Sequence, residues 1–148
     1  MKWKRIHLAG DQGNIMLLGI GFIGICLLAL AVITDASSAF IQQRELQAQA
    51  DSIALAGAQG IDLAQYYENG ATEATTLDPV NVATLVHDHF NASIDTASQE
   101  PSPKMAFTST PSGVFVTLTA PLRLTFFDAL AFEPINVSAA ARLDYRGN

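Results

Sequence analysis

The segment from Gln12 to Thr34 constrains the fold more than any other, because its 23 residues carry no charge and nearly all are apolar beyond Asn14. A helix rises about 1.5 Å per residue, so about 20 apolar residues cross the roughly 30 Å hydrocarbon core of a bilayer. A single segment crosses only as a helix, since a helix satisfies its own backbone hydrogen bonds in lipid. We therefore expect residues 12–34 to form a transmembrane helix.

The charges on the two sides of this segment predict its orientation. Lys2, Lys4 and Arg5 precede it, and the positive-inside rule places such a cluster in the cytoplasm. Beyond Asp35 there are twelve acidic and five basic residues, a net charge of −7. An acidic domain does not suit nucleic acid as a partner, because phosphates require a basic face. We expect a single-pass membrane protein with a cytoplasmic tail over residues 1–11 and everything beyond the anchor outside.

Two features of the anchor leave alternatives open. Cys26 is the only cysteine, so no internal disulfide can form. We expect a small apolar side chain that faces lipid or a helix partner, and lipidation of Cys26 is the alternative. Small residues after Thr34 also permit cleavage of a secretory signal near Ala36 or Ala39. Retention is favoured because the apolar region exceeds the roughly 7–15 residues of such signals and the helical pattern continues.

Residues 35–66 predict an exported helix that continues the anchor. They lack proline and are rich in alanine, glutamine, leucine and glutamate, all good helix formers. The pattern predicts a helix that ends near Tyr66, and a rod of about 80 Å together with the anchor. One stripe of mostly small residues recurs at helical spacing, and Ala54 is a further candidate for helix packing. The stripe consists of Leu46, Ala50, Ile53, Gly57, Ile61 and Ala64.

This stripe has two interpretations that do not exclude each other. An ordinary amphipathic helix would cover its own domain with it. Alternatively, small residues let a neighbouring helix approach closely, so the stripe would pack on copies of this chain or on related subunits. The alanine and glycine content favours the second interpretation slightly, and with it self-association through the N-terminal helix.

The spacing of apolar residues changes from helical to alternating along residues 67–148. This change predicts a small α+β domain. Asp78-Pro79 is a typical helix start, and the apolar face that follows predicts a short helix that ends near Asn91, with a loop over 92–104. Alternating residues predict a hairpin over 105–110 and 114–120 and a last strand over 135–143, while 122–126 also alternates. The fold class is therefore α+β, with an antiparallel sheet of three or four strands covered by a helix.

Gly19, Gly21 and Gly24 match the spacing of a dinucleotide-binding fingerprint. That fingerprint needs a preceding strand and an acidic residue about 20 positions later, and here it lies within the membrane segment. We expect the three glycines to form a smooth surface for helix packing, and we expect no cofactor.

Metal binding and catalysis receive little support. His87 and His89 are two residues apart, whereas a helical two-histidine site needs a spacing of four. No other ligand type clusters with them, and no nucleophile, base and orienting group form a recognisable set. We expect no metal site, no catalytic residues and no enzyme activity.

Residues 10–58 resemble the N-terminal region of the TadE/TadG-like family of bacterial tight-adherence (Flp-type) pilus systems. The resemblance rests on Asp11-Gln12-Gly13, the single apolar helix, a Gln/Arg patch and the alanine-rich segment 44–58 (RELQAQADSIALAGA). It implies a pilin-like architecture and a structural or assembly role beside other pilus or secretion-system subunits, in the cell membrane or a filament.

The resemblance also raises the question of processing. Related pilins are cut after a glycine and carry glutamate at the fifth mature position, and Gly10 and Gly13 are the candidate processing sites. A cut after Gly13 puts Leu18 at that position, and a cut after Gly10 puts Ile15 there. The missing glutamate favours an uncleaved anchor of the TadG type.

The alternative function is a membrane-tethered module whose sheet, or loop 92–104, binds an envelope or surface ligand.

Overall fold

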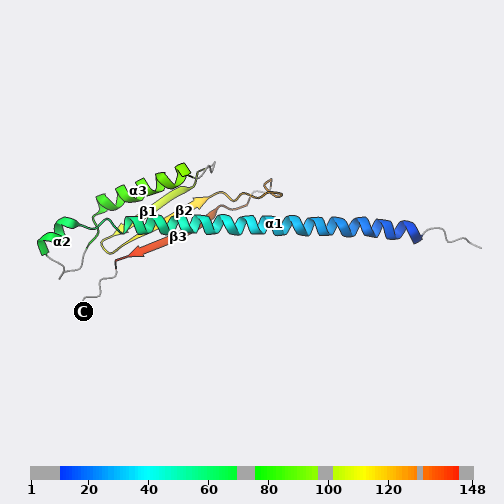
Figure 1. The fold of residues 1–148 in the computed structure, drawn as a ribbon, viewed down its shortest axis with the longest axis horizontal. Coiled ribbons are helices and arrows are strands. Elements are labelled where there is room, and N and C mark those ends of the chain that lie inside the picture. The colour runs from blue at the N-terminus through cyan, green and yellow to red at the C-terminus, as the bar shows by residue number, and fades with distance from the viewer. Residues whose placement is uncertain (1–10, 70–75, 97–101, 130–131, 144–148) are drawn as a thin grey trace, which may run out of the picture.

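The computed structural model describes residues 11–69, 76–96, 102–129 and 132–143. Figure 1 shows one long helix whose C-terminal half carries all other elements, while its N-terminal half projects alone. The fold is α+β, as predicted. The elements in chain order are α1 (Asp11–Gly57), α2 (Leu63–Asn69), α3 (Pro79–Thr96), β1 (Lys104–Thr110), β2 (Gly113–Ala120) and β3 (Ile135–Arg142).

Helix α1 runs without interruption from the apolar segment into the α+β domain. Its 47 residues correspond to about 70 Å. In the described part of the chain, α1 is the one helix long and apolar enough to cross a membrane, judged by length and composition. The side chains from Ile15 to Thr34 are exposed, with the exception of the half-buried Ala31. Within the described residues, no other part of the chain covers most of this surface, as expected for a segment that faces lipid.

The predicted continuation of this helix to Tyr66 is wrong, because α1 ends at Gly57. Gly60 is buried against α3, where a Cβ atom would lie 2.8 Å from the backbone nitrogen of Val82. The carbonyl oxygen of Gly60 also accepts the backbone N–H of Asp78 at 2.9 Å. Close approach of two backbones at this glycine turns the chain, so α2 is a separate short helix.

Helix α3 begins where the sequence predicts and ends later. A carboxylate oxygen of Asp78 accepts the backbone N–H of Val80 at 3.0 Å, which caps the first turn. The helix continues to Thr96 instead of Asn91, because no proline or glycine interrupts it before Pro101. The first part of the expected loop 92–104 is therefore helix, and residues 97–101 of that loop lie outside the described residues.

The described sheet has three antiparallel strands in the order β1-β2-β3. The predicted hairpin is confirmed, with Thr110 opposite Gly113 at its turn, and the predicted last strand pairs with β2. The alternating run 122–126 is not a strand, although its period resembles one. Its backbone bonds to side chains of α1 instead, as described below.

One face of the sheet forms the core. Helix α1 covers β2 and β3 on this face, and α3 packs beside α1 and contacts β1. The opposite face is mostly polar, with Thr117 hydrogen-bonded to Ser138 at 3.1 Å across the strands. The largest fully buried side chains are Ile53, Leu118, Val82, Val86, Val114 and Val116.

Candidate functional site

Asp35 lies directly after the apolar segment and is the buried charged residue of the described core, with 4% of its surface exposed. Its carboxylate accepts the backbone N–H groups of three successive residues between β2 and β3. Thr125 donates at 2.8 Å, Phe126 at 3.1 and 3.2 Å to the two oxygens, and Phe127 at 2.9 Å. These bonds fasten the segment 121–129, which we call the junction loop, to the point where α1 leaves its apolar half.

The chemistry of this contact explains how a carboxylate can be buried there. A buried charge is costly unless it is paired or hydrogen-bonded. Successive backbone N–H groups form a concave donor surface that suits an anion, and hydrogen bonds to a charged acceptor are stronger than neutral ones. Asp35 thus receives from the junction loop the hydrogen bonds that water would otherwise supply.

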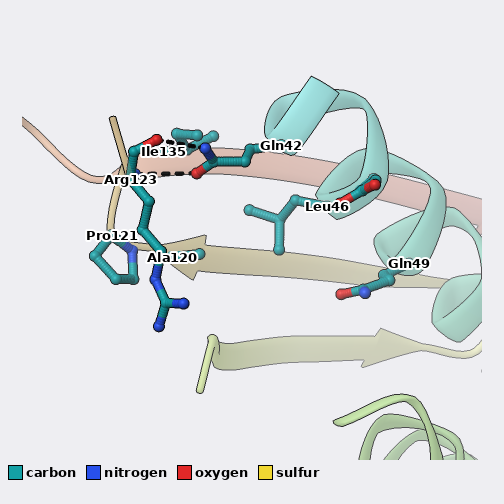
Figure 2. A pocket seen from close by; sticks show the side chains of 8 residues that line it. Gln42, Leu46, Gln49, Ala120, Pro121, Arg123 and Ile135 are labelled. Atoms are coloured by element: carbon teal, nitrogen blue, oxygen red, sulfur yellow. Dashed lines mark hydrogen bonds between the residues drawn. The ribbon is translucent and has the colours of Figure 1, made fainter. Parts of the chain in front are cut away.

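Gln42 fastens the same loop two turns further along α1. Its side-chain nitrogen donates to the carbonyl oxygen of Arg123 at 2.5 Å, and its side-chain oxygen accepts the backbone N–H of Arg123 at 3.0 Å. Figure 2 shows both bonds between the helix and the extended chain. The amide side chain therefore pairs with Arg123 as a neighbouring strand would, which satisfies backbone groups that no strand reaches.

A small cleft of about 220 Å³ lies beside this contact (Figure 2). It is smaller than the roughly 300–1,000 Å³ typical of ligand pockets. The described residues contain no group of three or more side chains that could hold a metal ion. The cleft is lined by Gln42, Glu45, Leu46, Gln49, Ala120, Pro121, Arg123 and Ile135.

The small-residue stripe of α1 faces the interior of its own domain. Leu46, Ala50, Ile53 and Ala54 are at most 4% exposed, and a Cβ atom on Gly57 would lie 2.7 Å from a methyl carbon of Val86. The sheet and α3 thus fill the stripe, which is the first of its two interpretations. In this fold these five residues have no free surface for another subunit, and the other two predicted members of the stripe, Ile61 and Ala64, lie beyond the end of α1.

The anchor glycines, in contrast, are open. A Cβ atom on Gly19, Gly21 or Gly24 would have nothing within 4 Å. Gly21 and Gly24 are three residues apart and share a face of α1, whereas Gly19 precedes Gly21 by two residues and lies on another side. The single smooth surface expected for all three therefore reduces to the Gly21–Gly24 face. Cys26 is exposed on the same helix.

The candidate processing sites lie at the start of the described chain. Gly13 belongs to the first turn of α1, and Gly10 lies outside the described residues. Processing at either glycine remains a prediction.

The two histidines have separate partners. The ring of His87 stands edge-on to the ring of Phe107 at a centroid distance of 5.5 Å. The Nε2 atom of His89 lies 2.5 Å from the hydroxyl oxygen of Ser52 on α1. They do not converge on one point, and each helps α3 to pack.

The sequence interpretation missed Asp35, Gln42 and the junction loop. One signal was available for Asp35, since a carboxylate next to a membrane segment is costly unless a partner satisfies it. The identity of that partner was not readable, because Phe126 lies 91 residues away in the sequence.

A comparison with protein families gives a match in the N-terminal part of the chain. Residues 13–60 match the family model Tad, described as "Putative Flp pilus-assembly TadE/G-like". No curated protein and no solved structure matches the chain. The match covers nearly all of α1 and the turn at Gly60, about a third of the chain. Residues 13–60 are thus similar to the TadE/G-like Flp pilus-assembly family, as the resemblance in the sequence indicated.

Proposed function

We propose that this chain is a non-enzymatic, membrane-anchored structural or assembly subunit of a bacterial tight-adherence (Flp-type) pilus or a related secretion system. The observation that carries the proposal is the TadE/G-like match over 13–60, which coincides with α1 and includes both its apolar half and its domain-covering half. The N-terminus lies in the cytoplasm and the α+β domain outside, in accordance with the charges of the tail. The anchor is retained.

The geometry suits a subunit that couples a membrane helix to an exported domain. Helix α1 passes from one to the other without a break, and Asp35 and Gln42 bind the domain's junction loop to the helix just beyond the anchor. A displacement of the anchor is thereby transmitted to the domain. Neighbouring subunits that align their anchors would also align their domains.

The proposed contact between subunits is the Gly21–Gly24 face. Small residues three apart allow the backbone of a second helix to approach closely, and helix association in lipid depends on such packing. Cys26 follows Gly21 by five residues and Gly24 by two, which places it on the opposite side of α1. It therefore provides a matched control, because leucine there adds bulk to the anchor on the face not proposed for contact.

The proposal is tested in cells that lack the native chain and express variants of the full chain. The unaltered chain should restore surface pili and should co-purify in detergent with other pilus proteins. The double variant Gly21→Leu/Gly24→Leu should lose both properties, and Cys26→Leu should keep both. Equal membrane levels and equal protease resistance of the domain show that the variants differ in assembly and not in folding.

The outcomes separate the proposed role from the proposed contact. Cells that form normal pili without the chain contradict the assembly role. Normal pili with the double variant contradict the Gly21–Gly24 contact and leave the role in place.

A further inference from the structure

The connection between β2 and β3 is unusually apolar for an exposed segment. Residues 121–134 contain three of the eight phenylalanines of the chain. Phe126 is 61% exposed and Phe132 is 52% exposed. Connecting segments normally run over the surface with small and polar residues, so exposed aromatic side chains here indicate a surface that another phase or molecule covers.

The position of this connection identifies what covers it. The backbone of Phe126 is bonded to Asp35, which follows the last residue of the apolar segment. Figure 1 shows residues 121–129 and 132–134 of the connection beyond the end of the sheet, along α1 toward its N-terminal half. Ala31 is half-buried, whereas the other side chains from Ile15 to Thr34 are exposed. The loop region therefore lies at the height where the anchor enters the hydrocarbon core.

The bilayer has an extended interface at this height. The headgroup regions bring the total thickness to about 40–45 Å, beyond a hydrocarbon core of about 30 Å. Apolar side chains that lie flat in this interface gain from burial of apolar area. Ile33, two residues before Asp35 on α1, is 62% exposed, so apolar side chains of the anchor lie at the same height along α1 as the bonds to the loop.

The charges near the loop favour hydrophobic insertion over electrostatic attraction. Arg123, Asp128 and Glu133 are all exposed. One basic and two acidic side chains give no net attraction for anionic lipids, which bind clusters of several basic residues. The surface therefore suits a zwitterionic lipid interface.

We propose that Phe126 and Phe132 insert into the external membrane interface, so that the exported domain rests on the bilayer beside its own anchor. This inference requires the anchor to span a bilayer, which is part of the proposed function, and it does not require a pilus. The bonds from Asp35 to residues 125–127 hold the inserted segment at a fixed depth.

The test uses the full chain in phosphatidylcholine vesicles whose acyl chains carry bromine, which quenches tryptophan fluorescence within the bilayer. Trp3 is the only tryptophan, so the Trp3→Phe background has none. Into this background Phe126→Trp, or Phe132→Trp as a second reporter, is introduced. Both should lose emission with brominated lipid and should be protected from acrylamide in the water.

Two further tryptophan reporters serve as controls, one inside the membrane and one in water. Leu18→Trp lies within the apolar anchor and should lose emission with brominated lipid. Phe115→Trp replaces a residue of β2 that is 40% exposed. The adjacent residue Val114 packs near Gly57, at the end of α1 that is far from the apolar segment. Phe115→Trp should respond to acrylamide and not to brominated lipid.

The proposal is overturned if Phe126→Trp and Phe132→Trp behave as Phe115→Trp does while Leu18→Trp is quenched. It is also overturned if their emission depends on the density of protein in the vesicle and not on bromination, because a second copy of the chain then covers the loop. Absence of quenching at Leu18→Trp contradicts the membrane anchor itself, and with it the proposed function.

Discussion

The carboxylate of Asp35 accepts the backbone N–H of Phe126, 91 residues later in the chain, at 3.1 Å to one oxygen and 3.2 Å to the other. The covalent path between these two residues passes through α3 and the β1–β2 hairpin. Their contact therefore closes the whole domain onto the base of its own anchor. This contact holds the junction loop at the C-terminal end of the apolar segment, together with the bonds from Gln42 to Arg123.

Removal of this carboxylate should loosen the junction loop. Asp35→Ala leaves the N–H groups of residues 125–127 without their acceptor, and unsatisfied groups of this kind cost about 1–3 kcal/mol. We expect the free energy of unfolding of the domain to fall by about 2 kcal/mol. Hydrogen exchange of the full chain in detergent should show faster exchange at the amides of Thr125, Phe126 and Phe127.

Asp51→Ala is the matched control for Asp35→Ala. Asp51 is exposed on the same helix and accepts only the side chain of Gln47 among the described contacts, at 3.1 Å. Its removal should change stability by less than about 0.5 kcal/mol. Equal effects of the two alanine variants would show that the buried carboxylate contributes no more than an exposed one.

The stability that Gln42 contributes should depend on its amide group and not only on the length of its side chain. Gln42→Glu replaces the donor nitrogen that faces the carbonyl oxygen of Arg123 with a second oxygen, so attraction becomes repulsion. We expect a loss of about 1–3 kcal/mol, measured by thermal or denaturant unfolding. Gln43→Glu introduces the same charge at an exposed neighbour and should have little effect. Similar losses in both variants would assign the effect to charge alone.

Glycine at position 60 should tolerate no side chain. In Gly60→Ala the new methyl would lie 2.8 Å from the backbone nitrogen of Val82, and a backbone atom cannot easily move away. In Gly57→Ala the closest atom, at 2.7 Å, is a methyl carbon of Val86. Overpacking of this kind costs typically about 1–3 kcal/mol. We expect Gly60→Ala to destabilise the domain more than Gly57→Ala does.

The control for these glycine variants is Gly24→Ala, whose new methyl would have nothing within 4 Å. It should leave the unfolding of the α+β domain unchanged. A larger loss in Gly57→Ala than in Gly60→Ala would contradict the distinction between a mobile side chain and a fixed backbone.

Ile53 should be the most sensitive position of the stripe, because it is fully buried between α1 and the rest of the core. Ile53→Ala should cost about 2–5 kcal/mol in the free energy of unfolding. Leu55→Ala, two residues away and 61% exposed, should cost less than about 0.5 kcal/mol. If Ile53→Ala instead leaves the domain stable and impairs only co-purification with pilus proteins, the stripe serves another subunit after all.

Local patterns in the sequence were sufficient for most elements. The uncharged run from Gln12 to Thr34, the cap at Asp78 and the alternation around the 111–113 turn each depend on neighbouring residues, and the corresponding helices and strands are present. Two helix ends were predicted wrongly. The end predicted near Tyr66 depends on a contact with a distant part of the chain, and the end predicted near Asn91 fails because no strong helix breaker follows it. Gly60 turns the chain because α3 lies against its backbone.

The sequence by itself determined the apolar anchor, the helical extension beyond it, the α+β class and the TadE/G-like resemblance later matched over 13–60. Only the tertiary structure decided which partners the polar and small residues have. In the folded chain the stripe of α1 packs against the chain's own sheet. The carboxylate of Asp35 accepts hydrogen bonds from three backbone amides of the junction loop. The physical reason is that periodicity encodes which face of an element is apolar, whereas burial of a charge depends on backbone groups brought there from far along the chain.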